Sequence, residues 1–155
     1  MMRLISGAAA IGLLAASPAS AQDAPFETVM PTDPEALAFQ EAVGYSDAVI
    51  VGDMVYLSGV VAGPAEGETD MAPGFARAFD HIGTILTRAG VSWDDVIAIE
   101  TFHTDLPGQI ETFAEVKNRY IKAPFPTWTA LGISALYEPT ALVEIKITAH
   151  RSDAE

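Results

Sequence analysis

The sequence predicts a single-domain α+β protein, and three observations lead to this class. Two segments have apolar residues at helical spacing, and segments rich in β-forming residues precede, separate and follow them. The resulting order is β-β-α-β-α-β-β. Each of these helices has one apolar stripe, so both are expected on one face of a mixed sheet. Without its expected leader the chain retains about 134 residues, which suffice for one hydrophobic core but not comfortably for two.

The first 21 residues have the pattern of a secretory signal peptide. Arg3 precedes an apolar stretch at residues 4–16, and Ala19-Ser20-Ala21 forms a small-residue cleavage site before Gln22. We therefore expect a mature protein that begins at Gln22 and is periplasmic or secreted. A retained N-terminal membrane anchor is the alternative, because hydropathy separates anchors from cleaved signals imperfectly.

The composition argues against several classes of function. The 8 basic and 21 acidic residues give a net charge of −13, which becomes 7 − 21 = −14 when Arg3 leaves with the leader. Nucleic acids and anionic membranes repel such a chain. Without cysteine there is no disulfide, thiolate nucleophile or cysteine zinc site. The three histidines, His81, His103 and His150, lack metal-ligand spacing, and we expect neither a metal nor a cofactor.

The beginning of the mature chain is interpreted as an N-terminal arm. Residues 22–44 contain Pro25, Pro31 and Pro34 among acidic and small residues, and a turn near residues 37–42 is their only apolar repeat. A hairpin is expected next, because two β-favouring runs at residues 48–58 enclose the turn dipeptide Gly52-Asp53. The Gly, Pro and acidic cluster at residues 63–70 predicts an exposed loop.

Local patterns also define the remaining elements. Apolar residues at helical spacing predict helices at residues 73–89 and 107–121. The apolar residues of the run 96–103 are partly out of phase, which favours a central strand buried on both faces. Further strands are expected at residues 127–132 and 141–149.

Five strings of the sequence occur together in an informative order and spacing: YSDAV (45–49), VGDMVYLSG (51–59), AGVSWDDV (89–96), TFHTD (101–105) and ALVEI (141–145). In sequence, order and spacing they resemble the Rid (YjgF-like) family. The resemblance implies a chorismate-mutase-like α+β fold over residues 45–152 and a homotrimer with three clefts between subunits. It also implies hydrolysis of small enamines and imines without a cofactor.

The resemblance also assigns roles to individual residues. Glu144 matches a glutamate that orients or activates water, and Tyr45 and Ser58 match residues that line the cleft. The arginine that binds the substrate carboxylate has no counterpart, because the family's Pro-x-Arg-Ser is replaced here by Pro126-Thr127-Trp128-Thr129. Trp128 and Thr129 are therefore expected to contact substrate in its place. Indole offers one neutral N–H donor and a π face, which suits a neutral or cationic amine-like ligand.

Other readings of these residues remain open. Glu144 also fits a solvated strand residue paired with Lys146, and Trp128 also fits a core or interface aromatic. His81 on a helix and His103 at a strand end are weaker candidates for a catalytic base. The whole protein also fits a non-catalytic binding or scavenging trimer with an aromatic-lined cleft. A holdase-like role has no positive feature in the sequence.

Overall fold

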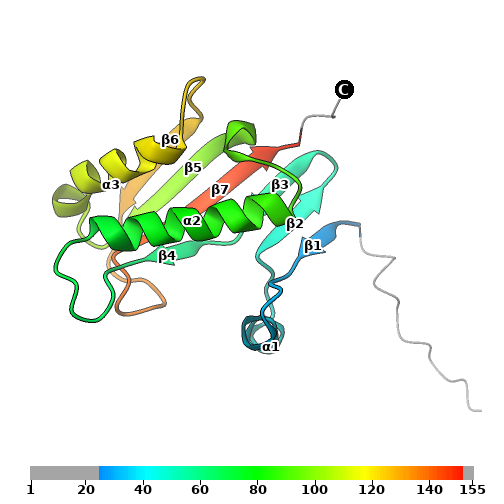
Figure 1. Cartoon of the computed structure of the whole chain (residues 1–155), viewed down its shortest axis with the longest axis horizontal. Coiled ribbons are helices and arrows are strands. Elements are labelled where there is room, and N and C mark those ends of the chain that lie inside the picture. The colour runs from blue at the N-terminus through cyan, green and yellow to red at the C-terminus, as the bar shows by residue number, and fades with distance from the viewer. Residues whose placement is uncertain (1–24, 152–155) are drawn as a thin grey trace, which may run out of the picture.

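A computed structural model describes residues 25–151, so the expected leader (residues 1–21) and the cleavage site before Gln22 lie outside the described residues. Figure 1 shows a mixed sheet with two long helices, α2 and α3, across one face. The α+β class is confirmed. Between residues 25 and 151 no helix combines the length and apolarity needed to cross a bilayer.

The sheet has seven strands in the order β1-β2-β3-β7-β5-β6, with β4 also paired to β7. Neighbouring strands are antiparallel except β5 and β6, which are parallel and joined by α3. The helix makes that crossover possible, because parallel strands cannot be joined by a tight turn. The strands are β1 (Glu27–Val29), β2 (Ala48–Val51), β3 (Met54–Leu57), β4 (Val60–Ala62), β5 (Val96–His103), β6 (Thr127–Gly132) and β7 (Val143–His150).

The two long helices match the expected ones closely. α2 (Ala72–Arg88) and α3 (Leu106–Tyr120) begin one residue before their expected start and end one residue before their expected end. Each turns its apolar stripe onto the sheet, and buried side chains of both helices and of β1, β2, β3, β4, β5 and β7 form one core. A short 3-10 turn, Trp93–Asp95, connects α2 to β5. The largest core residues are Phe75, Phe79, Ile82, Ile85, Leu86, Ile99, Phe113, Val116, Ile145 and Ile147.

The strand β5 differs from its expected environment. Its helix-facing residues, such as Ile99 and Thr101, are buried, whereas Ile97 is exposed and Phe102 is only half-buried. The expectation of burial on both faces is therefore wrong within this chain. The apolar residues are out of phase because the pairing of β5 with β7 shifts register between Val96 and Ala98, and such a bulge reverses the alternation.

The predicted arm contains regular structure that the sequence interpretation missed. β1 pairs with β2, and α1 (Pro34–Val43) lies beside that end of the sheet (Figure 1). Asp33 caps α1 by accepting hydrogen bonds from the backbone N–H groups of Glu35 and Ala36. Gly44 ends the helix with a φ of 87°, a left-handed conformation that favours glycine.

The unpredicted strand β4 creates a break that shapes the site. β3 pairs with the second half of β7 and β4 with its first half, so the two act as one interrupted strand. Ser58 and Gly59 form the interruption. They leave no β-ladder partner for Lys146 and Ile147 on this side of β7. The sheet is therefore open beside the middle of its longest antiparallel strand.

Candidate functional site

A cavity of about 490 Å³ lies at the strand break, and we call it the Glu144 cavity. Glu144 is in register with Val61 and Phe102, and it alternates along β7 with the buried Val143 and Ile145. It therefore projects from the sheet face opposite α2 and α3. The lining residues come from α1 and the segment after it, the strand break, β4, β7 and the loop before β7: Phe39, Val43, Tyr45, Ser58, Gly59, Val61, Tyr137, Glu138 and Glu144.

The carboxylate of Glu144 lies directly against the backbone of Gly59. A Cβ atom at Gly59 would be 2.6 Å from the Cδ atom of Glu144 and 2.9 Å from its Cγ atom, which is far closer than carbon atoms pack. Only glycine leaves this space, so the strand break acts as a seat for the carboxylate. Glu144 is half-buried there, with room for a ligand on the cavity side.

Ser58 and Tyr45 stand beside this carboxylate. The Ser58 hydroxyl donates to the backbone carbonyl of Ser46 at 2.7 Å, so its proton is engaged and its oxygen remains free to accept. Tyr45 is about two-fifths exposed, and its ring meets that of Phe39 edge-on with centroids 6.4 Å apart. The structure thus brings together Tyr45, Ser58 and Glu144, three of the five residues expected in the site.

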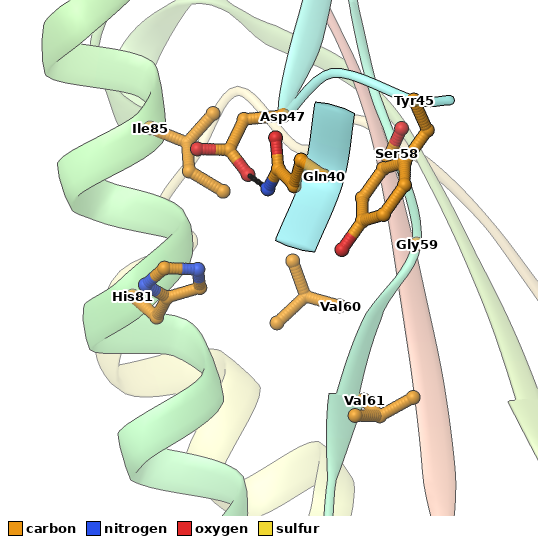
Figure 2. Close-up of a pocket in the computed structure, with 9 residues that line it drawn as sticks. All are labelled: Gln40, Tyr45, Asp47, Ser58, Gly59, Val60, Val61, His81 and Ile85. Carbon is orange, nitrogen blue, oxygen red and sulfur yellow. Dashed lines mark hydrogen bonds between the residues drawn. The ribbon is translucent and has the colours of Figure 1, made fainter. Parts of the chain in front are cut away.

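A smaller cavity of about 230 Å³ lies on the helix side of the same break (Figure 2). Tyr45, Ser58, Gly59 and Val61 line both cavities, so they form the wall between them. Gln40 donates from Nε2 to Asp47 at 2.6 Å, as Figure 2 shows, and Arg88 binds the other oxygen of Asp47 at 2.5 Å. This buried network ties α1, β2 and α2 together and fixes the hairpin end that carries Tyr45 and Ser58.

Trp128 and Thr129 do not line the Glu144 cavity. Trp128 packs toward α3, where its indole N–H donates to Thr101 Oγ1 at 3.0 Å and its ring contacts Phe113. The Lys117 ammonium lies 4.6 Å from the indole centroid. Thr129 follows on the edge strand β6 and is exposed. Within one chain, the indole that replaces the family's arginine faces the opposite side of the sheet from Glu144.

The histidines do not add a base to the Glu144 cavity. His103 is fully buried among core residues, with Nε2 3.0 Å from Thr101 Oγ1, and burial lowers its pKa. His81 lines the smaller cavity, and His150 is exposed at the end of β7. Across residues 25–151 no cluster of three or more His, Asp or Glu side chains is arranged to hold a metal ion.

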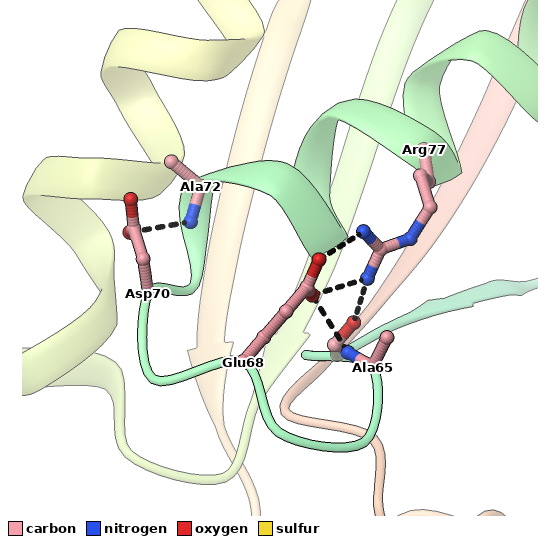
Figure 3. Close-up of polar contacts among 6 residues, drawn as sticks. Ala65, Glu68, Asp70, Ala72 and Arg77 are labelled. Atoms are coloured by element: carbon pink, nitrogen blue, oxygen red, sulfur yellow. Dashed lines mark hydrogen bonds and ion pairs between the residues drawn. The ribbon is translucent and has the colours of Figure 1, made fainter.

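The most strongly shifted carboxylate, Glu68, belongs to a loop and not to the site (Figure 3). Arg77 on α2 donates two hydrogen bonds to it and Ala65 donates a third, which lower its pKa from 4.5 to about 2. Figure 3 shows how this contact closes the 63–70 loop onto the start of α2. Shifted pKa values often mark active sites, but this one is fully accounted for by an exposed ion pair.

Comparison with known proteins identifies the family. The sequence profile described as Endoribonuclease L-PSP, which covers the YjgF, RutC and Rid proteins, matches residues 35–151. The chain belongs to this Rid family. Among curated Rid-family relatives, the RutC family protein YjgH of Escherichia coli K12 is 39% identical over 95 residues, which span 59% of this chain and 72% of that protein. A 2-iminobutanoate/2-iminopropanoate deaminase of Dermatophagoides farinae is 28% identical over 71% of this chain and 88% of that protein.

Solved Rid-family structures agree with the fold. Protein YJGH superposes with a TM-score of 0.71 at 32% identity, covering 84% of this chain and all of that chain. A member of the YjgF/YER057c/UK114 family from Mycobacterium tuberculosis gives a TM-score of 0.68 at 28% identity, covering 81% of this chain and 98% of that chain. The expected YjgF-like fold is confirmed.

In this Rid-family chain, the sequence interpretation missed six of the nine residues that line the Glu144 cavity: Gly59 and Val61 at the strand break and in β4, and four residues from other elements. Phe39 and Val43 lie one helical turn apart in the segment that was interpreted as an arm. Tyr137 and Glu138 lie in the loop before β7, which has no periodic pattern. The signals that could have indicated the first pair were the helix start Asp33-Pro34 and the helix stop Gly44, which enclose this segment.

Proposed function

We propose that this Rid-family protein hydrolyses the C=N bond of a small imine, or of the enamine from which it forms, with Glu144 as the general base. The observation that carries the proposal is the Glu144 carboxylate seated on Gly59 at the wall of a cavity of about 490 Å³. The named deaminase relative supports the reaction class. Ligand-sized cavities with a few convergent polar groups are the usual form of such sites.

The reaction needs few groups beyond a positioned carboxylate. An enamine that gains a proton at carbon becomes an iminium ion, whose carbon is electrophilic. Glu144 takes a proton from water as the oxygen bonds to that carbon, and it returns the proton to nitrogen. The C–N bond of the resulting carbinolamine then breaks, and the hydroxyl proton goes to the departing ammonia. The products are a carbonyl compound and an ammonium ion, which balances one iminium ion and one water.

We also propose that the protein is a homotrimer in which a neighbouring subunit completes each cleft. The sheet face opposite α2 and α3 supports this, because Val51, Tyr56, Val61 and Leu131 are large apolar residues left exposed on it. Trp128 and Thr129 would then contact substrate bound against the next subunit. Since the indole N–H already binds Thr101, Trp128 would offer its ring rather than a hydrogen bond.

We also propose that the protein is exported. The leader pattern supports a mature protein that begins at Gln22 and resides in the periplasm or is secreted. Expression of the full chain followed by cell fractionation and N-terminal sequencing tests it. A chain that retains Arg3 in the membrane fraction would favour the anchor.

The function is tested with a Glu144→Gln variant and freshly generated imines. Gln keeps the shape of the side chain but cannot take a proton from water, so ammonia release should fall to the uncatalysed rate. Glu111→Gln, at an exposed position of α3, is the matched control and should keep full activity. Retained turnover in Glu144→Gln would refute the role of this carboxylate.

A non-catalytic binding or scavenging protein is the second candidate. The observation that favours it is Trp128 at the position of the family's carboxylate-binding arginine, because a bidentate guanidinium is not replaced by indole. Wild-type protein that binds amines tightly but releases no ammonia from any imine would establish this alternative. A Trp128→Arg variant that gains hydrolysis of 2-imino acids would show that the arginine alone was missing.

A further inference from the structure

The Glu144 cavity has one apolar wall that the core does not explain. Phe39 and Val43 are 53% and 55% exposed, and Tyr137 is 89% exposed, although all three are large and apolar or aromatic. The only buried residue of α1 is Gln40, so this helix does not place its apolar residues in the core. Large side chains that gather around one cavity instead form a surface for an apolar ligand group.

The remaining walls carry negative charge and no positive charge. Glu138 and Glu144 both line the cavity, whereas no lysine, arginine or histidine is among its lining residues. Glu138 is held in place through Oε1, which accepts from the Thr140 hydroxyl at 2.9 Å and from the Thr140 N–H at 3.2 Å. Its other carboxylate oxygen has no hydrogen bond within the described part of the chain, so it is available to a ligand.

These features constrain the charge of the ligand. A carboxylate in the Glu144 cavity would lie near two glutamates, and the same subunit supplies no fixed cation to offset them, which disfavours a carboxylate there. A protonated imine or amine would instead be attracted by both carboxylates and by the faces of Tyr45 and Tyr137. The whole chain, with a net charge of −13, adds attraction for cations and repulsion for anions.

We propose that the substrate is the imine of a primary amine that carries an aromatic or bulky apolar group and no carboxylate. Phe39, Val43 and Tyr137 hold the apolar group, and Glu138 recognises the positive nitrogen as a specificity-determining residue. The reaction class rests on the function proposed above, whereas the ligand class rests on the lining of the cavity alone. Hydrolysis of such an imine yields an aldehyde and ammonium.

A matched pair of substrates tests this inference. An amine oxidase generates the imine of 2-phenylethylamine, and an amino-acid oxidase generates the imino acid of phenylalanine, so the two differ only in the carboxylate. We expect the amine-derived imine to have the larger kcat/KM by at least about tenfold, because the carboxylate meets two like charges. An equal or larger value for the imino acid would overturn the ligand class and leave the hydrolase function standing.

Direct binding separates the two proposals when neither substrate is turned over. Calorimetry with 2-phenylethylammonium and with 3-phenylpropionate measures ligand preference without chemistry. Binding of the ammonium ion alone would support the ligand class and refute the hydrolase. Binding of the carboxylate alone, or of neither compound, would overturn the ligand class.

Single variants test the named residues. Glu138→Gln keeps an acceptor for Thr140 but loses the charge, so KM for the amine-derived imine should rise about fivefold, the size of a partly exposed charge pair. Phe39→Ala should reduce the preference for a phenyl over an ethyl side chain. Glu66→Gln and Phe26→Ala, which do not line the cavity, are the matched controls. Glu138→Gln that behaves like Glu66→Gln would refute the role of Glu138.

Discussion

A methyl group added at Gly59 tests whether the position of the Glu144 carboxylate matters. Gly59 is not among the glycines with positive φ, so alanine can adopt its backbone conformation. The added Cβ atom would lie 2.6 Å from the Cδ atom of Glu144, whereas carbon atoms pack at about 3.5–4.0 Å. Glu144 must therefore move its carboxyl carbon by about 1 Å or adopt another rotamer.

The expected effect of Gly59→Ala is large on activity and small on stability. Misplacement of a catalytic group by about 1 Å costs roughly 100-fold in rate, which corresponds to about 2.7 kcal/mol of transition-state stabilisation. The free energy of unfolding should fall by less than about 1 kcal/mol, because Glu144 is half-buried and its side chain can rotate toward the cavity.

The assay combines ammonia release from an imine with urea unfolding of the same preparations. Gly132→Ala on β6 is the matched control, because a Cβ atom there would make only an ordinary contact of 3.7 Å with Leu106. It should retain activity and stability. Wild-type activity in Gly59→Ala would refute the claim that Gly59 determines the position of the Glu144 carboxylate. A loss of stability above about 3 kcal/mol would mean that the glycine is needed for the fold instead.

Three further predictions concern stability. Asp47→Ala should lower the free energy of unfolding by about 3 kcal/mol, because it leaves the partly buried Arg88 without its carboxylate; urea unfolding measures this, and a loss below 1 kcal/mol would contradict it. Tyr120→Phe removes a 2.8 Å hydrogen bond to Asp80 and should cost about 1 kcal/mol, with a smaller cost in an Asp80→Ala background, where the hydroxyl can still donate to the Ala76 carbonyl at 3.3 Å. Burial lowers the pKa of Lys117 below its usual 10.5, so the protonated lysine destabilises the fold at neutral pH and this penalty disappears as the pH rises toward 10.5. Wild type should therefore gain stability relative to Lys117→Met over that alkaline range, and an unchanged difference would show that the pKa is not lowered.

The elements that the sequence predicted best are those with strong local periodicity. α2 and α3 were located to within about one residue because each has a regular apolar pattern bounded by glycine, proline or a capping group, and β5 and β6 because each is a short run of β-forming residues with clear ends. α1 was missed because it buries only Gln40 and so has almost no apolar stripe toward the core. The residues that begin and end this helix, Asp33-Pro34 and Gly44, were visible in the sequence but were interpreted as parts of a loop.

The predicted site residues separate into two groups in the structure. Tyr45, Ser58 and Glu144 meet at one cavity although 99 positions separate the first from the last (144 − 45). Trp128 lies on the other side of the sheet, because its place in register with Ile99 directs it toward α3. No local pattern reveals this, since it depends on which residues of β5 and β6 pair.

The sequence by itself determined the α+β class, the two long helices and most strands, the family, and the identities of Glu144 and the residue that replaces the arginine. These depend on neighbouring residues, whose spacing and turn chemistry are encoded locally. Only the tertiary structure decided that Gly59 seats Glu144, that α1 supplies Phe39 and Val43, and that Glu138 adds a second carboxylate. The physical reason is that strand register and the break between β3 and β4 are set by packing and hydrogen bonding between distant segments.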